Sequence, residues 1–366
     1  PLPEVPHATD VRFPPPRTAA RCTAPPPLLS SWEGTLMRLV YHPAGHDDEL
    51  RVALVELEAG RWRTARELLL ATGTHGALRT SRTQVLAVAA ARSDVVGVWL
   101  REEPHHYDAH LMSARVAVER VLRAHRQHHP RTWEFEADAR REVLAAARRA
   151  PDDPVPLVCL LALAQVDTRQ QYYEHRLPAP ELMLPSGPWG ILDQVDRRDP
   201  YNREAYHRMI QFLLARDALP TASQAAVFDL GRSIVSQQPL GSPLLLLPAH
   251  ALVEQRRRIK VTPLWRRQWL EEPHIGYSLN AFRNWFHRAP PTLRSVADLN
   301  LLAYALWAGA KYQEAAEVFA TLGPYASREP WSTVCERTTG PDPGEALLLR
   351  ARAESLAYAR RTSHHP

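Results

Sequence analysis

Two stretches near opposite ends of the chain repeat one pattern of small and aromatic residues. Residues 58–69 read Glu-Ala-Gly-Arg-Trp-Arg-Thr-Ala-Arg-Glu-Leu-Leu, and residues 308–319 read Ala-Gly-Ala-Lys-Tyr-Gln-Glu-Ala-Ala-Glu-Val-Phe. In both, an aromatic residue stands three positions before an alanine and seven before a large apolar residue. This spacing predicts two antiparallel helices, because the alanine lets the backbones approach while the larger side chains fill the space around it.

Apolar residues recur at helical spacing along most of the chain. Proline-rich stretches at 168–188 and 323–344 interrupt this pattern, because proline lacks the N–H that a regular helix needs. Residues 36–41 fit either a short strand or the start of a helix. Beside the two repeated stretches, the pattern predicts helices at 85–92, 95–103, 107–128, 135–149, 155–165, 189–196, 203–216, 222–237, 244–257, 264–270, 279–286, 293–308, 312–322 and 345–361.

The repeated stretches resemble the turn of tetratricopeptide repeats, whose consensus reads Gly-x-Tyr-x-x-Ala-x-x-x-Phe. The second copy departs from that consensus at Ala310, where the family has glycine. Pro154 and Pro200 match the proline that the family carries between repeats. The resemblance implies an all-α fold, a right-handed tetratricopeptide-like α-solenoid of antiparallel helix pairs with two proline-rich irregular loops.

A longer stretch, 99–254, is similar to an uncharacterised family of helical proteins from high-GC Gram-positive bacteria. The matching pieces include Asp108-Ala-His110, Asp152-Asp-Pro154-Val-Pro156 and Gly241-Ser-Pro243. This actinobacterial resemblance implies a helical architecture and carries no catalytic residue with it.

The distribution of proline and of helical pattern divides the chain into three predicted regions. Residues 1–31 hold nine prolines and predict an extended arm. Residues 32–188 form an N-terminal helical-repeat half that ends in a proline-rich loop, and residues 189–366 form a C-terminal half with a closing helix whose charged face caps the core.

The charge and cysteine content restrict the class of partner. The net charge of +5 is spread over helices in which acidic and basic residues interleave, whereas nucleic-acid binding favours a stripe of one sign. The dense basic run at 256–260, continued by Arg266 and Arg267, fits a solvated helix end or a nucleic-acid contact.

Three distant cysteines form no disulfide framework. The sequence has no apolar run of membrane length and no signal-peptide pattern, which predicts a cytoplasmic protein that contacts no membrane.

The sequence contains no pattern typical of a catalytic centre. It has no Gly-x-Ser-x-Gly nucleophile turn and no phosphate-binding glycine loop, so we expect no catalytic residue and no cofactor. His106 and His110 are four positions apart and share a helix face, which makes them weak candidate metal ligands. No third ligand accompanies them, and we therefore expect no native metal site.

Aromatic residues and arginines gather in two places that could meet a partner. Trp265, Trp269 and Trp285 interleave with Arg266 and Arg267, and this cluster fits either core packing or a groove for a peptide. Tyr172 and Tyr173 lie in the first irregular stretch. All seven residues are candidate partner-binding positions.

The function that these patterns favour is a non-catalytic cytoplasmic scaffold, which binds a peptide or protein partner on a concave helical-repeat surface. One alternative is a regulatory or accessory factor that contacts nucleic acid through the basic cluster, which the interleaved charges disfavour. Another is a helical enzyme or a histidine-based metal-binding protein.

Overall fold

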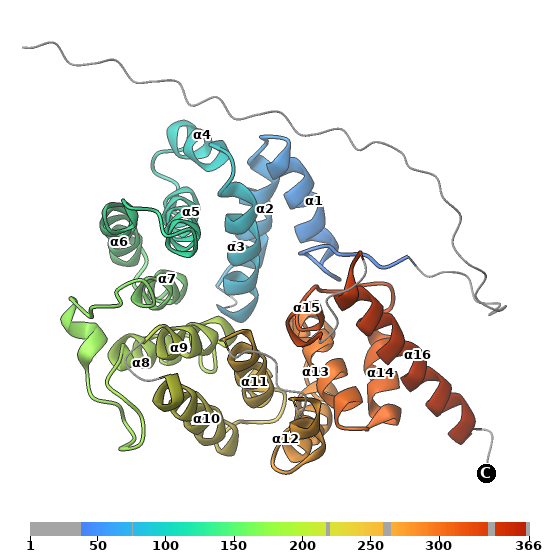
Figure 1. Cartoon of the computed structure of the whole chain (residues 1–366). Coiled ribbons are helices and arrows are strands. Elements are labelled where there is room, and N and C mark those ends of the chain that lie inside the picture. The colour runs from blue at the N-terminus through green and yellow to red at the C-terminus, as the bar shows by residue number, and fades with distance from the viewer. Residues whose placement is uncertain (1–37, 75, 217–219, 259–264, 336–340, 364–366) are drawn as a thin grey trace, which may run out of the picture. The chain divides into compact units, whose positions relative to one another are not determined.

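The computed structural model describes residues 38–74, 76–216, 220–258, 265–335 and 341–363, with residues 220–224 described by their backbone alone. Within these ranges the secondary structure is helical apart from two isolated bridges, which confirms the predicted all-α class (Figure 1). The predicted arm at 1–31 lies outside the described residues.

The α-helices follow one another with short connections. In the first half they are α1 (Asp48–Glu58), α2 (Arg63–Thr72), α3 (Gly76–Ala90), α4 (Val95–Glu102), α5 (Tyr107–Arg126), α6 (Thr132–Arg149), α7 (Val155–Ala164) and α8 (Trp189–Asp196). In the second half they are α9 (Arg203–Ala215), α10 (Pro220–Ser236), α11 (Leu247–Arg258), α12 (His274–Ala281), α13 (Val296–Ala308), α14 (Tyr312–Leu322), α15 (Trp331–Val334) and α16 (Pro343–Ser363).

Several predicted helices differ from the structure in extent or type. The helix predicted at 85–92 is the second half of α3, which begins nine residues earlier at Gly76. The segments predicted at 264–270 and 279–286 contain a 3-10 helix, Trp265–Leu270, and a π-helical turn, Phe282–Phe286, that continues α12. Apolar periodicity alone does not distinguish these hydrogen-bond patterns in short segments, because the side-chain spacing is similar.

The two repeated sequence stretches form two helix pairs with the same turn. Helices α1 and α2 pack together, as do α13 and α14, and the alanines at both contacts, Ala65 and Ala315, are buried. Each turn closes with the bond of a helix C-cap, from Arg61 N to Glu56 O at 2.9 Å and from Lys311 N to Leu306 O at 2.8 Å. The predicted helix-pair geometry of both stretches is therefore confirmed.

Three apolar cores follow the chain. The first joins helices α1 to α5, the second extends from α5 to α11, and the third joins the residues from α11 to α16. The predicted division between residues 188 and 189 falls inside the second core, which contains both Leu184 and Trp189. Helix α7 has no polar face, and every residue from Val155 to Ala164 is therefore able to be buried, as the structure shows.

The first described residues pair with the C-terminal helices. Val40 N donates to Pro324 O at 2.8 Å, and Ala326 N donates to Val40 O at 3.0 Å, which makes Val40 an isolated bridge within the segment that fitted either a strand or a helix start. Tyr41 donates from its hydroxyl to Glu345, 304 positions away, at 2.9 Å. In an open solenoid each repeat contacts only its neighbours. Here the two ends of the described array contact each other, and Arg51 of α1 also donates to the Tyr325 hydroxyl at 2.5 Å.

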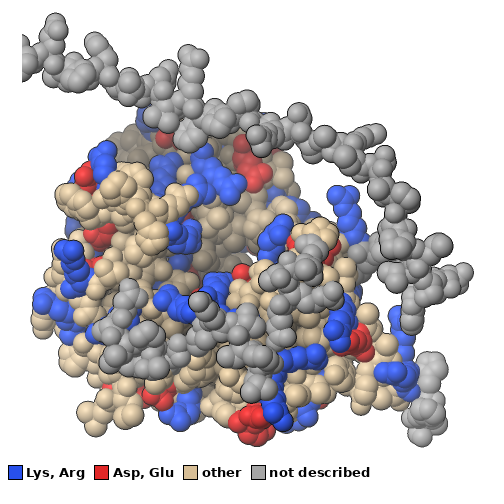
Figure 2. Space-filling view, viewed as in Figure 1, with Lys and Arg blue, Asp and Glu red and all other residues tan. Residues whose placement is uncertain are grey.

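Charged side chains are dispersed over the surface. On the described part of the face in Figure 2, arginine and lysine side chains are scattered among acidic ones and gather into no single stripe. No helix within the described ranges is both long and apolar enough to cross a bilayer.

Candidate functional site

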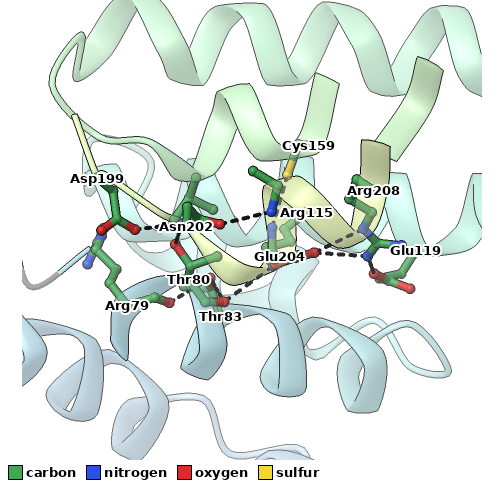
Figure 3. A network of polar contacts seen from close by, with 12 residues as sticks. Arg79, Thr80, Thr83, Arg115, Glu119, Cys159, Asp199, Asn202, Glu204 and Arg208 are labelled. Atoms are coloured by element: carbon green, nitrogen blue, oxygen red, sulfur yellow. Dashed lines mark hydrogen bonds and ion pairs between the residues drawn. The ribbon is translucent and has the colours of Figure 1, made fainter. Parts of the chain in front are cut away.

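A buried network of ion pairs and hydrogen bonds joins α3, α5, α7 and α9 (Figure 3). Arg115 of α5 pairs with Glu204 of α9, and both side chains are almost completely buried. Arg208 donates to Glu204 at 2.9 Å and to Glu119 at 3.2 Å. Burial alone would raise the pKa of Glu204, but Arg115 and Arg208 outweigh it and hold that pKa below its usual value.

The same network continues along α3 through a second buried arginine. Arg79 pairs with Asp108 and, at 2.8 Å, with Asp153, which also accepts from the Tyr107 hydroxyl at 3.1 Å. Each of these charges is matched by a protein partner that holds two helices together. This mutual pairing favours a structural role, since a catalytic or ligand-binding group would present a free atom to a substrate.

The two weak metal candidates are used in local backbone contacts. His106 is the N-cap of α5, and its Nδ1 accepts from Asp108 N at 3.2 Å. His110 Nε2 lies 2.7 Å from Pro104 O. Among the described residues no group of three histidine, cysteine, aspartate or glutamate side chains is arranged to hold a metal ion.

The three candidate tryptophans lie in the core. Trp265, Trp269 and Trp285 are at most 4% exposed, and Trp269 contacts the Tyr304 ring edge-on at 5.3 Å between centroids. Of the two interpretations that the sequence left open, their burial fits core packing and leaves no face of these rings for a peptide. The spacing of the aromatic residues could not distinguish the two, because it is equally compatible with a core and with a groove.

In the basic cluster beside these tryptophans, the described arginines are largely engaged in internal contacts, and Lys260 lies outside the described residues. Arg256 lies over the Trp265 ring at 5.7 Å, and Arg266 lies over the Trp307 ring at 4.1 Å. Arg257 pairs with Glu254 at 2.9 Å, whereas Arg267 is exposed. These contacts weaken the case for a nucleic-acid surface, which needs several cations free to meet phosphates.

A cleft of about 320 Å³ opens between the start of α2 and the end of α4. Its walls carry both signs of charge, and one pair, Arg66 and Glu103, is joined at 3.0 Å. The floor is Trp62, which stacks on Trp99 at 5.4 Å. The residues that line it are Trp62, Arg63, Arg66, Glu67, Glu102 and Glu103.

The two remaining candidates, Tyr172 and Tyr173, lie in an irregular segment, residues 167–187, that joins α7 to α8. As the prolines predict, this 167–187 segment holds no α-helix, only a 3-10 turn at Tyr173–Arg176. Its second half is closed by a bridge in which Gly187 N donates to Leu177 O at 2.8 Å. Leu184 is buried in the second core, so the tip of the segment is held against the helices.

Tyr172 and Tyr173 have opposite environments although they are adjacent. The Tyr172 hydroxyl donates to Glu136 of α6 at 2.9 Å, and the guanidinium of Arg140 lies over its ring at 3.8 Å. Tyr173 is 72% exposed. The structure thus makes Tyr172 an anchor of the 167–187 segment and Tyr173 a side chain available to a partner.

The 167–187 segment also exposes two large apolar side chains in its second half. Leu182 is fully exposed and Met183 is 75% exposed, whereas the neighbouring Leu184 is buried. Apolar composition alone does not show which of three adjacent apolar residues faces inward.

Sequence reasoning also missed the groups that hold this segment in place. Asp167 accepts from Gln171 N at 2.9 Å and from Tyr172 N at 3.2 Å, and it lies 2.8 Å from Nδ1 of His175. An aspartate followed by polar residues is a turn signal, and it could have identified the start of this anchor.

Comparisons with known proteins supply no relative: no family model, no curated protein and no solved structure matches the chain.

Proposed function

We propose that this protein is a non-catalytic helical-repeat scaffold that binds a protein partner, and that the partner docks on the 167–187 segment. The observation that carries the proposal is the display of Tyr173, Leu182 and Met183, three large apolar side chains at least 72% exposed on one short segment. Exposed apolar groups in contiguous sets mark interaction sites more often than isolated ones do.

The anchoring of the segment supports a docking role because a fixed surface loses less entropy on binding. Its first half is held by the Tyr172 contact with Glu136, and its second half by the Leu177–Gly187 bridge and the burial of Leu184. A flexible loop would have to be ordered by the partner, at a cost of about 0.5–1.5 kcal/mol for each side chain immobilised.

The residue types on the segment indicate the chemistry of the partner. Tyrosine and methionine are enriched in the cores of protein interfaces, and methionine adapts to irregular apolar surfaces. Arg169 and Arg176 flank Tyr173 and are both exposed. The partner that fits is therefore an apolar segment of another protein with acidic residues at its edge, which the two arginines contact at the rim.

The proposal is tested by identifying a partner through affinity capture with mass spectrometry and then measuring its dissociation constant with purified proteins. Tyr173→Ala and Leu182→Ala should each weaken binding by about tenfold or more, since burying such a side chain stabilises a complex by roughly 1.5–3 kcal/mol. Leu240→Ala is the matched control, because Leu240 is 66% exposed and lies outside the segment. If both segment variants bind as tightly as the control, the docking surface is elsewhere.

A further inference from the structure

The 167–187 segment is anchored by a buried histidine that has one partnered and one unpartnered nitrogen. The His175 side chain is completely buried, and its Nδ1 lies 2.8 Å from Oδ2 of Asp167. A carboxylate oxygen accepts, so Nδ1 carries the proton in the neutral ring. The other nitrogen, Nε2, is buried and has no hydrogen-bond partner among the residues that the structure describes.

Burial disfavours a second proton on His175, whereas the carboxylate of Asp167 favours it. Arg140 of α6 lies over the neighbouring Tyr172 ring and pairs with Glu174, and its positive charge opposes a charged imidazole. The other carboxylate on this side of α6, Glu136, is occupied by the Tyr172 hydroxyl. Helix α8 also packs against this turn, but its Asp193 pairs with Arg197 and its Asp196 accepts from Tyr206.

A protonated His175 would leave an N–H group of a cation buried and unpaired at Nε2. Burying an unpaired charge is costly in a protein interior, and the cost is relieved when the group reaches water. The imidazole can reach water only if the turn Tyr173–Arg176 moves, because His175 belongs to this turn and its side chain is completely buried.

We propose that the Asp167–His175 pair is an acid-sensitive anchor, which holds the 167–187 segment against α6 and α8 at neutral pH and releases it on mild acidification. The inference rests on the proposed function in one respect: the anchored 167–187 segment is the proposed docking surface, so its release by acid would weaken partner binding. The anchor itself is independent of whether any partner docks there.

The direction of the pH effect follows from the environment of His175. Burial lowers the pKa of His175 below its ordinary value of 6.5, and the hydrogen bond to Asp167 opposes this only in part. The released state, with an ordinary pKa, binds the proton more tightly. The anchored state is therefore fully favoured above pH 6.5 and loses stability as pH falls from 6.5 toward the lowered value.

Protonation of Glu136 has the opposite effect on the balance between the anchored and released states. Burial raises its pKa above the ordinary 4.5, so its protonation favours the anchored state as pH falls. One pH unit below 6.5, the histidine alone would increase the released population by about tenfold. This value is an upper limit for the unmodified protein, and a Glu136→Gln variant, which removes the opposing proton, should come closest to it.

Hydrogen–deuterium exchange with mass spectrometry tests the anchor without any partner. Peptides that cover residues 167–187 should exchange several-fold faster at pH 5.5 than at pH 7.5, after correction for the intrinsic exchange rate, while peptides from α13 keep the same corrected rate. His175→Gln cannot titrate but can still donate to Asp167, so in this variant the corrected rate should not rise between pH 7.5 and pH 5.5. Equal rates in the unmodified protein at the two pH values would overturn the proposal.

A second measurement decides the case in which His175→Gln releases the segment at every pH. The NMR titration of the His175 Cε1 proton in the unmodified protein should give a pKa below 6.5, and a value at or above 6.5 would refute the anchor. The docking proposal is tested separately, by Tyr173→Ala and Leu182→Ala at pH 7.5. Acid release in a protein whose variants bind normally would retain the anchor and reject the docking surface.

Discussion

Because the same turn occurs twice, opposite substitutions at one backbone position in the two copies should have opposite effects on stability. Gly60 in the first turn and Ala310 in the second occupy equivalent places, and both have left-handed backbones with φ of 80° and 57°. For an L-residue this conformation costs roughly 1–2 kcal/mol. Glycine adopts it freely but loses about 0.4–1 kcal/mol more in chain entropy on folding. We therefore expect Ala310→Gly to stabilise the protein by about 0.5–1 kcal/mol.

The converse variant, Gly60→Ala, should destabilise the protein by a similar amount. A Cβ atom at Gly60 would meet nothing within 4 Å, so the loss would come from the backbone and not from a steric clash. Ala59→Gly is the matched control: Ala59 has φ of −79°, where glycine brings no relief and only the entropic loss remains.

The assay is urea denaturation followed by the helical circular dichroism signal, with free energies taken from the midpoint and the slope. The predicted order of stability is Ala310→Gly, then the unmodified protein, then Gly60→Ala. A destabilised Ala310→Gly variant, with Gly60→Ala unchanged, would refute the claim that the two sequence repeats share one turn.

Further predictions concern the helix contacts, the buried network and metal content. Ala315→Leu should overpack the α13–α14 contact and lower the free energy of unfolding by about 1–3 kcal/mol, and a variant with the original denaturation midpoint would contradict the close packing. Glu204→Gln should cost about 3–5 kcal/mol because Arg115 would keep a buried charge without its counter-charge, and an unchanged midpoint would show that the pair is solvated. Elemental analysis of untagged protein should find less than about one-tenth equivalent of transition metal, and a stoichiometric metal would restore His106 and His110 as candidate ligands.

Local pattern was sufficient for the helices and for their pairing at both ends of the chain. The spacing of Trp62 and Ala65, and of Tyr312 and Ala315, predicts a contact between two consecutive helices. Helices joined by a short connection usually lie next to each other, so local sequence is enough to predict such a contact. The prolines of the 168–188 stretch likewise sufficed to exclude an α-helix there.

Contacts between residues that are far apart in the chain could not be predicted from local sequence pattern. Arg115 and Glu204 are 89 positions apart and look like ordinary surface charges in an amphipathic helix, yet they form a buried pair. The contact of Val40 with Pro324 and Ala326 depends on how all the intervening helices stack. Burial of the candidate tryptophans depends on the same stacking, and for this reason the sequence left their role open.

The candidate site was predicted only in part for the same reason. Tyr173 was predicted as a contact residue and is exposed, whereas its neighbour Tyr172 was predicted equally and is an anchor. The difference arises from α6, which supplies Glu136 and Arg140 from more than thirty positions earlier in the chain. The sequence of the 167–187 segment itself does not predict contacts with Glu136 and Arg140.

The most direct test of the docking surface is site-specific photo-crosslinking with a partner obtained by affinity capture. A photoreactive amino acid placed at position 182 should crosslink to an apolar segment of the partner that is flanked by acidic residues, because Leu182 is fully exposed at the tip of the 167–187 segment. The same probe at position 240 should give no crosslink. Crosslinking from position 240 and none from position 182 would contradict the assignment of the 167–187 segment as the docking surface.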